Sequence, residues 1–203
     1  GVPGAMMSVS GHSLLNRIIF EERYSEVDLI LGRLHIELTE LLHTEKTDTQ
    51  DGMEIQILCI NKNDGTISYS GARNPIYFTD TSNQLHKLKA DKHSIGGTRT
   101  YGLPEFTKHQ LPQDWQNIFL FTDGYQDQFG TSGKKFMVGK FKKLLADISH
   151  LKTNDQIQLL KETLQSWQAG EEQTDDILVA TIQRTPLFEK LTQKEKNKLL
   201  SLL

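Results

Sequence analysis

Two short acidic segments hold the residues best suited to chemistry. Residues 119–124 (FLFTDG) run from an apolar stretch into Asp123, and residues 174–179 (TDDILV) run from Asp175 and Asp176 into another. A carboxylate at the end of a buried strand is costly to desolvate, so it usually lies beside a cation or a set of hydrogen-bond donors. The glycine after Asp123 lets the chain turn sharply and bring its backbone close to a ligand. The two segments therefore indicate a hard metal ion with oxygen ligands.

The two segments can act together if their strands are neighbours, because the carboxylates then lie at the same edge of a sheet. Mg²⁺ and Mn²⁺ prefer such oxygens. Two of these ions about 3.5–4 Å apart can share a bridging water and lower its pKa, and the hydroxide can attack phosphorus in line. No side-chain nucleophile is then needed, and the sequence has no convincing Ser-His-Asp or Cys-His set. The alternative is structural, because Asp-Gly is a common turn and such aspartates often bind only backbone N–H groups.

Length and composition favour one cytoplasmic globular domain. The chain has 203 residues, a formal net charge of −3 and a pI near 6.2, which give no general attraction to nucleic acid or anionic membranes. No apolar stretch approaches the roughly 20 residues that span a bilayer, and residues 1–10 lack the regions of a secretion signal. The single cysteine, Cys59, excludes an internal disulfide, and its apolar surroundings favour a small buried core residue.

The hydrophobic patterns predict helices, then strands, then helices, then a last strand. Helices are expected near residues 4–20, 25–43, 134–148 and from Asn154 as the cap to Gly170 as the stop. Strands are expected near residues 53–59, 66–70, 76–79, 84–88, 118–121 and 177–182. Turn signals at residues 63–65 (NDG) and 80–83 (DTSN) indicate hairpins. This order predicts an α+β fold with antiparallel sheets.

Five segments, in order, carry a resemblance to the SpoIIE-type branch of the metal-dependent protein serine/threonine phosphatases, the protein phosphatase 2C-like family. The segments are residues 1–8 (GVPGAMMS), 51–55 (DGMEI), 70–75 (SGARNP), 122–136 (TDGYQDQFGTSGKKF) and 172–177 (EQTDDI). The resemblance covers about residues 1–184 and identifies that stretch as a catalytic domain. It implies a four-layer α-β-β-α sandwich of two antiparallel sheets flanked by helix pairs.

The resemblance also implies the site and its substrates. Two divalent cations, Mn²⁺ or Mg²⁺, would lie at one edge, with Asp123 and Asp175 as ligands. Asp176 would orient its neighbour or reach a metal through water. Substrates would be phosphoserine or phosphothreonine on small regulatory proteins, including anti-sigma-factor antagonists. A positive group in the turn at Arg73 and Asn74 could hold the substrate phosphate, and an exposed surface turn is the alternative.

The sequence departs from the family pattern at its start. The family's Asp-x-x-Gly-His segment, and an earlier strand pair with a further acidic residue, should precede Gly1. We therefore expect the domain to be N-terminally incomplete, and these 203 residues alone to bind metal weakly and turn over poorly. Residues 185–203 are expected to form a linker and a helix, or the start of a further domain similar to the lead-in helix of cyclic-nucleotide-binding domains.

The function expected from these observations is metal-dependent hydrolysis by the output module of a larger bacterial signalling protein with sensory or regulatory domains. Two alternatives stay open. One is a catalytically inactive phosphatase fold that serves as a binding module, and the other is a two-metal phosphohydrolase that acts on small molecules. The seven histidines show no ligand spacing, and the lysine pairs lack the interleaved aromatic residues of a nucleic-acid surface.

Overall fold

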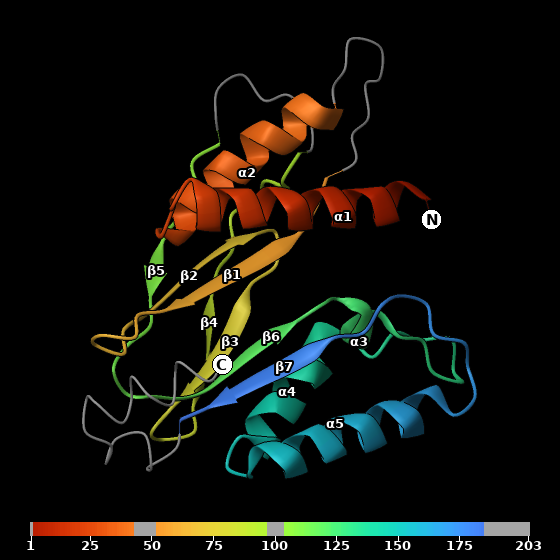
Figure 1. The fold of residues 1–203 in the computed structure, drawn as a ribbon. Coiled ribbons are helices and arrows are strands. Elements are labelled where there is room, and N and C mark those ends of the chain that lie inside the picture. Colours follow the sequence, from red (N-terminus) through yellow and green to blue (C-terminus); the bar gives the residue numbers. More distant parts are fainter. Residues whose placement is uncertain (1, 43–51, 97–103, 185–203) are drawn as a thin grey trace. The chain divides into compact units, whose positions relative to one another are not determined.

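The computed structural model describes residues 2–42, 52–96 and 104–184. Its contacts divide the chain into two compact units. The first comprises the described residues up to Pro75 and those from Lys89 to Leu111. The second comprises Ile76–Leu88 and the described residues from Pro112 onward. Each unit combines one antiparallel sheet with helices of its own (Figure 1).

In the first unit, helices α1 (Val2–Asn16) and α2 (Val27–Leu42) are joined through the π-helical turn η1 (Arg17–Glu21). The sheet has the order β1-β2-β5. Its strands are β1 (Ile55–Ile60), β2 (Ile67–Ala72) and β5 (His109–Gln110). The antiparallel pairing of β1 with β2 confirms the hairpin predicted at residues 63–65.

The core of this unit forms where α2 faces β1 and β2. Apolar residues recur every three or four positions along α2, so one face of the helix is buried. Leu31, Leu34 and Leu38 are among the fully buried side chains on that face. They pack in one cluster with Ile18 of η1 and Ala72 of β2. The helix predicted over residues 25–43 is thus confirmed over Val27–Leu42. Leu41 near its C-terminal end is 54% exposed, so the apolar face is not buried over its whole length.

In the second unit, the sheet has the order β4-β3-β6-β7, and every neighbouring pair is antiparallel. The strands are β3 (Ile76–Asp80), β4 (Leu85–Leu88), β6 (Trp115–Phe121) and β7 (Val179–Gln183). The helices are α3 (Gly124–Asp127), α4 (Val138–Ile148) and α5 (Thr153–Gln168). Strand β6 is central in the sheet, as its continuous apolar run predicts.

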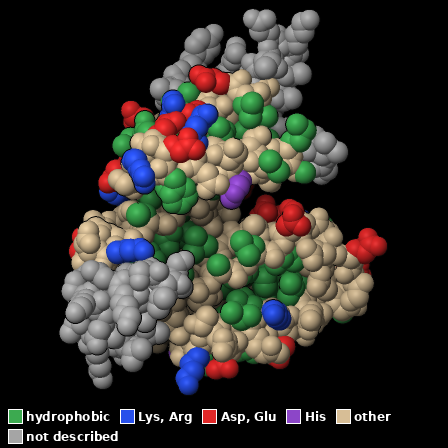
Figure 2. Space-filling view, viewed as in Figure 1, with side chains coloured by type: hydrophobic (Ala, Val, Ile, Leu, Met, Phe, Trp, Pro, Cys, Tyr) green, Lys and Arg blue, Asp and Glu red, His purple; other side chains and the backbone are tan. Residues whose placement is uncertain are grey.

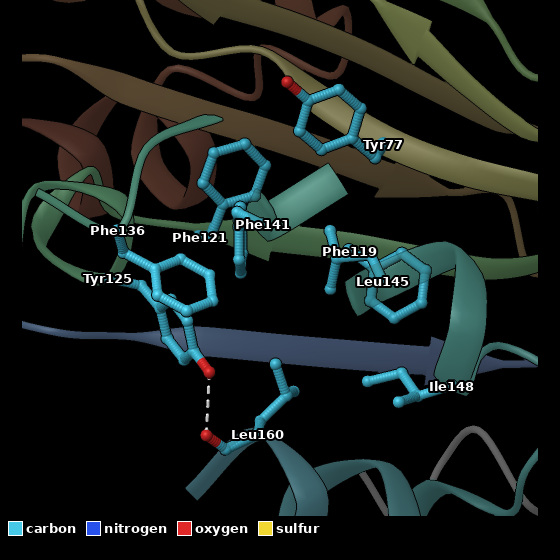
Figure 3. Packing of buried hydrophobic residues seen from close by; sticks show 9 residues of the cluster. All are labelled: Tyr77, Phe119, Phe121, Tyr125, Phe136, Phe141, Leu145, Ile148 and Leu160. Carbon is cyan, nitrogen blue, oxygen red and sulfur yellow. Dashed lines mark hydrogen bonds between the residues drawn. The ribbon is translucent and has the colours of Figure 1, made fainter. Parts of the chain in front are cut away.

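The core of the second unit is largely aromatic and includes Tyr125 of α3 (Figure 3). The Tyr125 ring lies 4.8 Å from that of Phe141 and 5.3 Å from that of Phe136 between centroids. Its hydroxyl donates a 2.8 Å hydrogen bond to the backbone oxygen of Leu160 in α5, and burial raises the pKa of Tyr125. These contacts fix α3, which begins directly after Asp123, to the body of the unit.

Three sequence-based predictions were wrong in detail. The helix expected over residues 134–148 begins at Val138, because residues 128–136 form a closed loop in which the Phe136 amide donates to the Gln128 carbonyl oxygen at 3.0 Å. Asn154 is not the cap of α5, because that helix begins at Thr153 after Lys152. Cys59 is only partly buried, because β1 is the outer strand of its sheet within the described residues.

The predicted α+β class with two antiparallel sheets is confirmed. No helix in the described ranges has the length and apolar character needed to cross a membrane. The segment expected to form a linker and helix, residues 185–203, lies outside the described residues.

Candidate functional site

Strands β6 and β7 bring the two acidic segments together. The two strands are antiparallel, and the last residue of β6, Phe121, pairs with the first residue of β7, Val179. The chain leaving β6 therefore meets the chain entering β7 at one end of the sheet. The Thr122 amide continues the ladder by donating a 3.0 Å hydrogen bond to the carbonyl oxygen of Leu178. The condition for the two segments to act together, that their strands be neighbours, is therefore met.

The side chain of Thr122 ties the segments more closely. Its hydroxyl donates a 2.7 Å hydrogen bond to the backbone oxygen of Asp176 and accepts one of 2.9 Å from the amide of Leu178. Both partners belong to the turn that carries the paired aspartates. A hydroxyl can donate and accept at once, so this single side chain satisfies two backbone groups of the opposite segment.

Gly124 allows the backbones of the two segments to touch. A Cβ atom at this position would lie 2.4 Å from the carbonyl oxygen of Asp176 and 2.9 Å from its carbonyl carbon. Real side chains do not approach backbone this closely, so only glycine fits without displacement. The sequence predicted that Gly124 brings its backbone close to a ligand, and the group that the structure places beside Gly124 is instead the backbone of Asp176.

All three aspartates are exposed, but their local contacts differ. Asp123 precedes the first turn of α3, and its carboxylate makes no capping hydrogen bond. Asp175 accepts a 2.7 Å hydrogen bond at Oδ1 from the backbone amide of Asp176. The structural alternative was that these aspartates only accept hydrogen bonds from backbone amides. It holds for Oδ1 of Asp175. It does not account for Asp123.

These carboxylates have the chemistry of a site for a hard cation. They are exposed oxygen donors on two turns whose backbones are in contact, and Mg²⁺ and Mn²⁺ favour such donors. Within the part of the chain that the structure describes, no three His, Cys, Asp or Glu side chains gather as a ready set of ligands. The described residues therefore offer the type of ligand atom that these cations prefer, but too few ligands for a complete site.

Arg73 and Asn74, the predicted phosphate-binding pair, lie in the turn between β2 and β3 and belong to the first unit. Arg73 has a φ of 62°, a left-handed conformation uncommon for residues other than glycine. Its Nε lies 3.0 Å from Oε1 of Glu54, and its side chain is 55% exposed. The backbone oxygen of Asn74 accepts a 2.7 Å hydrogen bond from the Tyr69 hydroxyl. The turn is thus well fixed, and Arg73 already has an acidic neighbour.

The first unit has an open cavity of ≈ 620 Å³ beside α1 and α2, where acidic and basic side chains intermingle (Figure 2). Arg33 lies 2.8 Å from the buried carboxylate of Glu37 and 3.0 Å from that of Glu22. Arg17 forms a second ion pair with Glu37. The two arginines of the lining thus pair with Glu22 and Glu37, and the pair of Arg17 with Glu37 joins η1 to α2.

Sequence reasoning gave no role to Thr122 or to Gln128, a fully buried residue just after α3. The sequence could have indicated a role for Thr122, because a threonine directly before Asp-Gly at the end of an apolar run lies at the strand end where the two acidic turns would meet. Gln128 offered none, because a glutamine in a polar stretch is usually exposed.

The family model of Stage II sporulation protein E (SpoIIE) matches residues 1–185. No curated protein matches the chain. The SiaA PP2C domain of Pseudomonas aeruginosa is similar in structure, with a TM-score of 0.76 and 22% identity over 91% of this chain and 72% of that one. The RsbU and RsbW domains of a Mycobacterium tuberculosis protein give a TM-score of 0.63 and 18% identity over 92% of this chain and 49% of that one.

A third structure contains the PP2C phosphatase domain and a fragment of the regulatory domain of SpoIIE from Bacillus subtilis. It gives a TM-score of 0.62 and 20% identity over 88% of this chain and 50% of that one. At these identities the likeness concerns the fold. The two antiparallel sheets and their helices match those of PP2C phosphatase domains.

Proposed function

The chain belongs to the SpoIIE family, and from this premise we propose that it hydrolyses phosphoserine or phosphothreonine on a regulatory protein with two divalent cations, Mn²⁺ or Mg²⁺. The observation that carries the proposal is the backbone contact between Gly124 and Asp176. It sets two exposed acidic turns side by side in a protein whose fold is that of PP2C phosphatase domains.

In this proposal Asp123 and Asp175 hold the cations, and Asp176 orients Asp175. The amide of Asp176 fixes Oδ1 of Asp175, so the carboxylate is oriented before any ligand arrives. Asp123 follows the buried end of β6 and precedes the fixed helix α3, so its backbone position is also set in advance. Bound cations would lower the pKa of a water and neutralise phosphoryl oxygens.

Arg73 and Asn74 are proposed to contact the substrate phosphate. The rigid turn and the exposed guanidinium support this role, and a guanidinium has N–H donors besides the Nε that faces Glu54. The expected effect of Arg73→Ala is a higher KM for a phosphopeptide with a smaller change in kcat, because binding is affected before chemistry.

We further propose that residues 1–184 act as the catalytic part of a cytoplasmic bacterial signalling protein, followed by a linker and helix in residues 185–203. Its substrate would be a phosphorylated regulatory protein, for example an anti-sigma-factor antagonist. Membership of the SpoIIE family supports this assignment. The single cysteine, which allows no internal disulfide, is in keeping with the cytoplasm.

One observation favours a second candidate, an inactive phosphatase fold that acts as a binding module. Among the described residues, fewer than three potential ligands come together at any place. A module that only binds a phosphoprotein would keep the fold and Arg73 without needing a complete set of metal ligands.

Hydrolysis of a phosphoserine peptide by the full-length protein, with and without Mn²⁺, separates the two candidates. We expect Mn²⁺-dependent phosphate release that falls at least about 100-fold in Asp123→Asn, because a carboxylate ligand is lost. Asp114→Asn changes an exposed aspartate outside the two turns and is the matched control. A folded wild type that binds the phosphopeptide and releases no phosphate would favour the binding module.

A further inference from the structure

Gln128 makes hydrogen bonds that reach the segment before Asp175. Its side chain is completely buried. Nε2 donates to the backbone oxygen of Glu172 at 2.8 Å and to that of Phe129 at 3.1 Å, while Oε1 accepts from the amide of Thr174 at 3.3 Å. A buried amide group that uses both its donor and its acceptor sites is fixed in orientation.

The segment that Gln128 holds has no regular structure of its own. Residues 171–178 lie between α5 and β7 and belong to no helix or strand. The hydrogen bonds found here for the backbone of Glu172 and Thr174 are those to Gln128. The side chain therefore replaces the secondary structure that would otherwise fix this stretch.

Gln128 is itself firmly held. Its backbone oxygen accepts hydrogen bonds from the indole Nε1 of Trp167 and from the amide of Phe136, both at 3.0 Å. The loop continues past Trp167 so closely that a Cβ atom at Gly130 would lie 2.8 Å from the Trp167 carbonyl oxygen. The segment before Asp175 is thus tied through Gln128 to α5 and to the loop after α3.

Asp175 consequently lies between two anchors that both come from the segment starting at Thr122. Thr122 holds the backbone of Asp176 and Leu178 on one side. Gln128 holds the backbone of Glu172 and Thr174 on the other. An irregular segment fixed at both sides keeps the residue between them within a narrow range of positions.

We propose that Gln128 is a positioning residue: it fixes residues 172–174 so that Asp175 is held beside the turn of Asp123, ready to bind a divalent cation. The inference rests on the proposed function, because it takes Asp175 to be a ligand. Gln128 itself touches neither substrate nor metal. By ordering residues 172–174 in advance, Gln128 lowers the conformational entropy that would otherwise be lost when Asp175 binds a cation.

The test compares full-length wild type with Gln128→Met, which keeps the length of the side chain and removes its hydrogen bonds. Gln158→Met, on the exposed face of α5, is the matched control. Hydrogen exchange measured by mass spectrometry reports residues 171–178 without reference to activity. Electron paramagnetic resonance of free Mn²⁺ reports metal binding directly, and peptide hydrolysis gives kcat and the Mn²⁺ requirement.

In Gln128→Met we expect exchange in residues 171–178 at least about 10-fold faster, unchanged exchange in β3 and β6, and about 10-fold weaker Mn²⁺ binding. Saturating Mn²⁺ should restore most of kcat, which a general loss of structure would not permit. Gln158→Met should match the wild type. Should Gln128→Met not fold, Gln128→Asn, which shortens the reach by one methylene, takes its place.

Unchanged exchange in residues 171–178 of the folded variant would overturn the proposal, and so would faster exchange with unaltered Mn²⁺ affinity. A wild type that neither binds Mn²⁺ nor hydrolyses the peptide would refute the proposed function instead. The exchange comparison would then still decide whether Gln128 fixes this segment.

Discussion

The hydroxyl of Thr122 donates a 2.7 Å hydrogen bond to the backbone oxygen of Asp176, which joins the two acidic turns through one side chain. The hydroxyl oxygen of Thr122 also accepts a 2.9 Å hydrogen bond from the Leu178 amide. Among the described residues, the side chain of Thr122 alone forms hydrogen bonds with both the Asp176 carbonyl and the Leu178 amide. The pair explains how two segments more than fifty residues apart hold one arrangement.

Thr122→Val should keep the branched shape and lose both hydrogen bonds. We expect about 1–2 kcal/mol less stability in urea unfolding, because two backbone groups lose their partner, and weaker Mn²⁺ binding. Thr122→Ser retains the hydroxyl and should stay close to the wild type. Equal stability of the valine and serine variants would show that the hydroxyl does not hold the turn.

Gly124→Ala should displace the turn of Asp176, because the new methyl group would lie 2.4 Å from its carbonyl oxygen. We expect a loss of about 1–3 kcal/mol in unfolding free energy together with loss of peptide hydrolysis. Gly139→Ala in α4, where a Cβ atom meets nothing within 4 Å, is the control and should be neutral or stabilising. An alanine at position 124 tolerated at wild-type stability would contradict the contact.

Asn117→Ala should be among the most destabilising polar substitutions in the second unit. Asn117 is 1% exposed, donates to Thr79 and to the Ser149 backbone, and accepts from Gln156. Its removal leaves buried groups unpaired, so we expect a loss of about 2–4 kcal/mol in chemical denaturation.

Asn154→Ala serves as the control for Asn117→Ala and also tests the structure of α5. Asn154 is exposed within the first turn of the helix. A true N-cap would cost about 1 kcal/mol when replaced by alanine, whereas this position should cost almost nothing. A loss of about 1 kcal/mol in Asn154→Ala would show that the sequence-based assignment of the cap was correct.

Asp80 should make the second unit less stable in acid. Its Oδ2 lies 2.7 Å from Nε2 of His86, and this hydrogen bond, helped by amides of the β3–β4 turn, lowers the pKa of the Asp80 carboxyl. Because the pKa is lower in the folded state, the stabilisation is complete above the unfolded value of about 3.9 and is lost as the pH falls through the folded value.

Asp80→Asn retains an acceptor for the turn amides and removes the charge. The stability difference from the wild type in urea should be present at neutral pH and shrink as the pH falls below about 4. A difference that grows in acid would have the wrong sign for a depressed carboxyl pKa.

The sequence predicted most of the architecture because long periodic segments dominate it. The apolar face of α2 and the continuous apolar run of β6 could be predicted from residue types alone. The predictions failed where tertiary contacts override local preference. The stretch before Val138 looked helical, yet the Phe136 amide bonds to Gln128 and Met137 takes a positive φ of 76°.

The candidate site was predictable in part. The sequence pointed to Asp123, Asp175 and Asp176 because a carboxylate beside a buried strand is costly to desolvate without a partner. The pairing of β6 with β7 then brings the two turns that carry them together. The role of Gln128 could not be predicted from the sequence, because it depends on hydrogen bonds to the backbone of Glu172 and Thr174, more than forty positions away.

The order in which the chain passes through the two units has a consequence for biosynthesis. The sheet that carries the acidic turns begins with β3 and is completed only by β7 at Val179–Gln183. A nascent chain made from its N-terminus can assemble the sheet of the first unit once residue 110 has left the ribosome, while the second sheet still lacks β6 and β7. The two acidic turns therefore meet late in synthesis, so a partly translated chain cannot hold both in place.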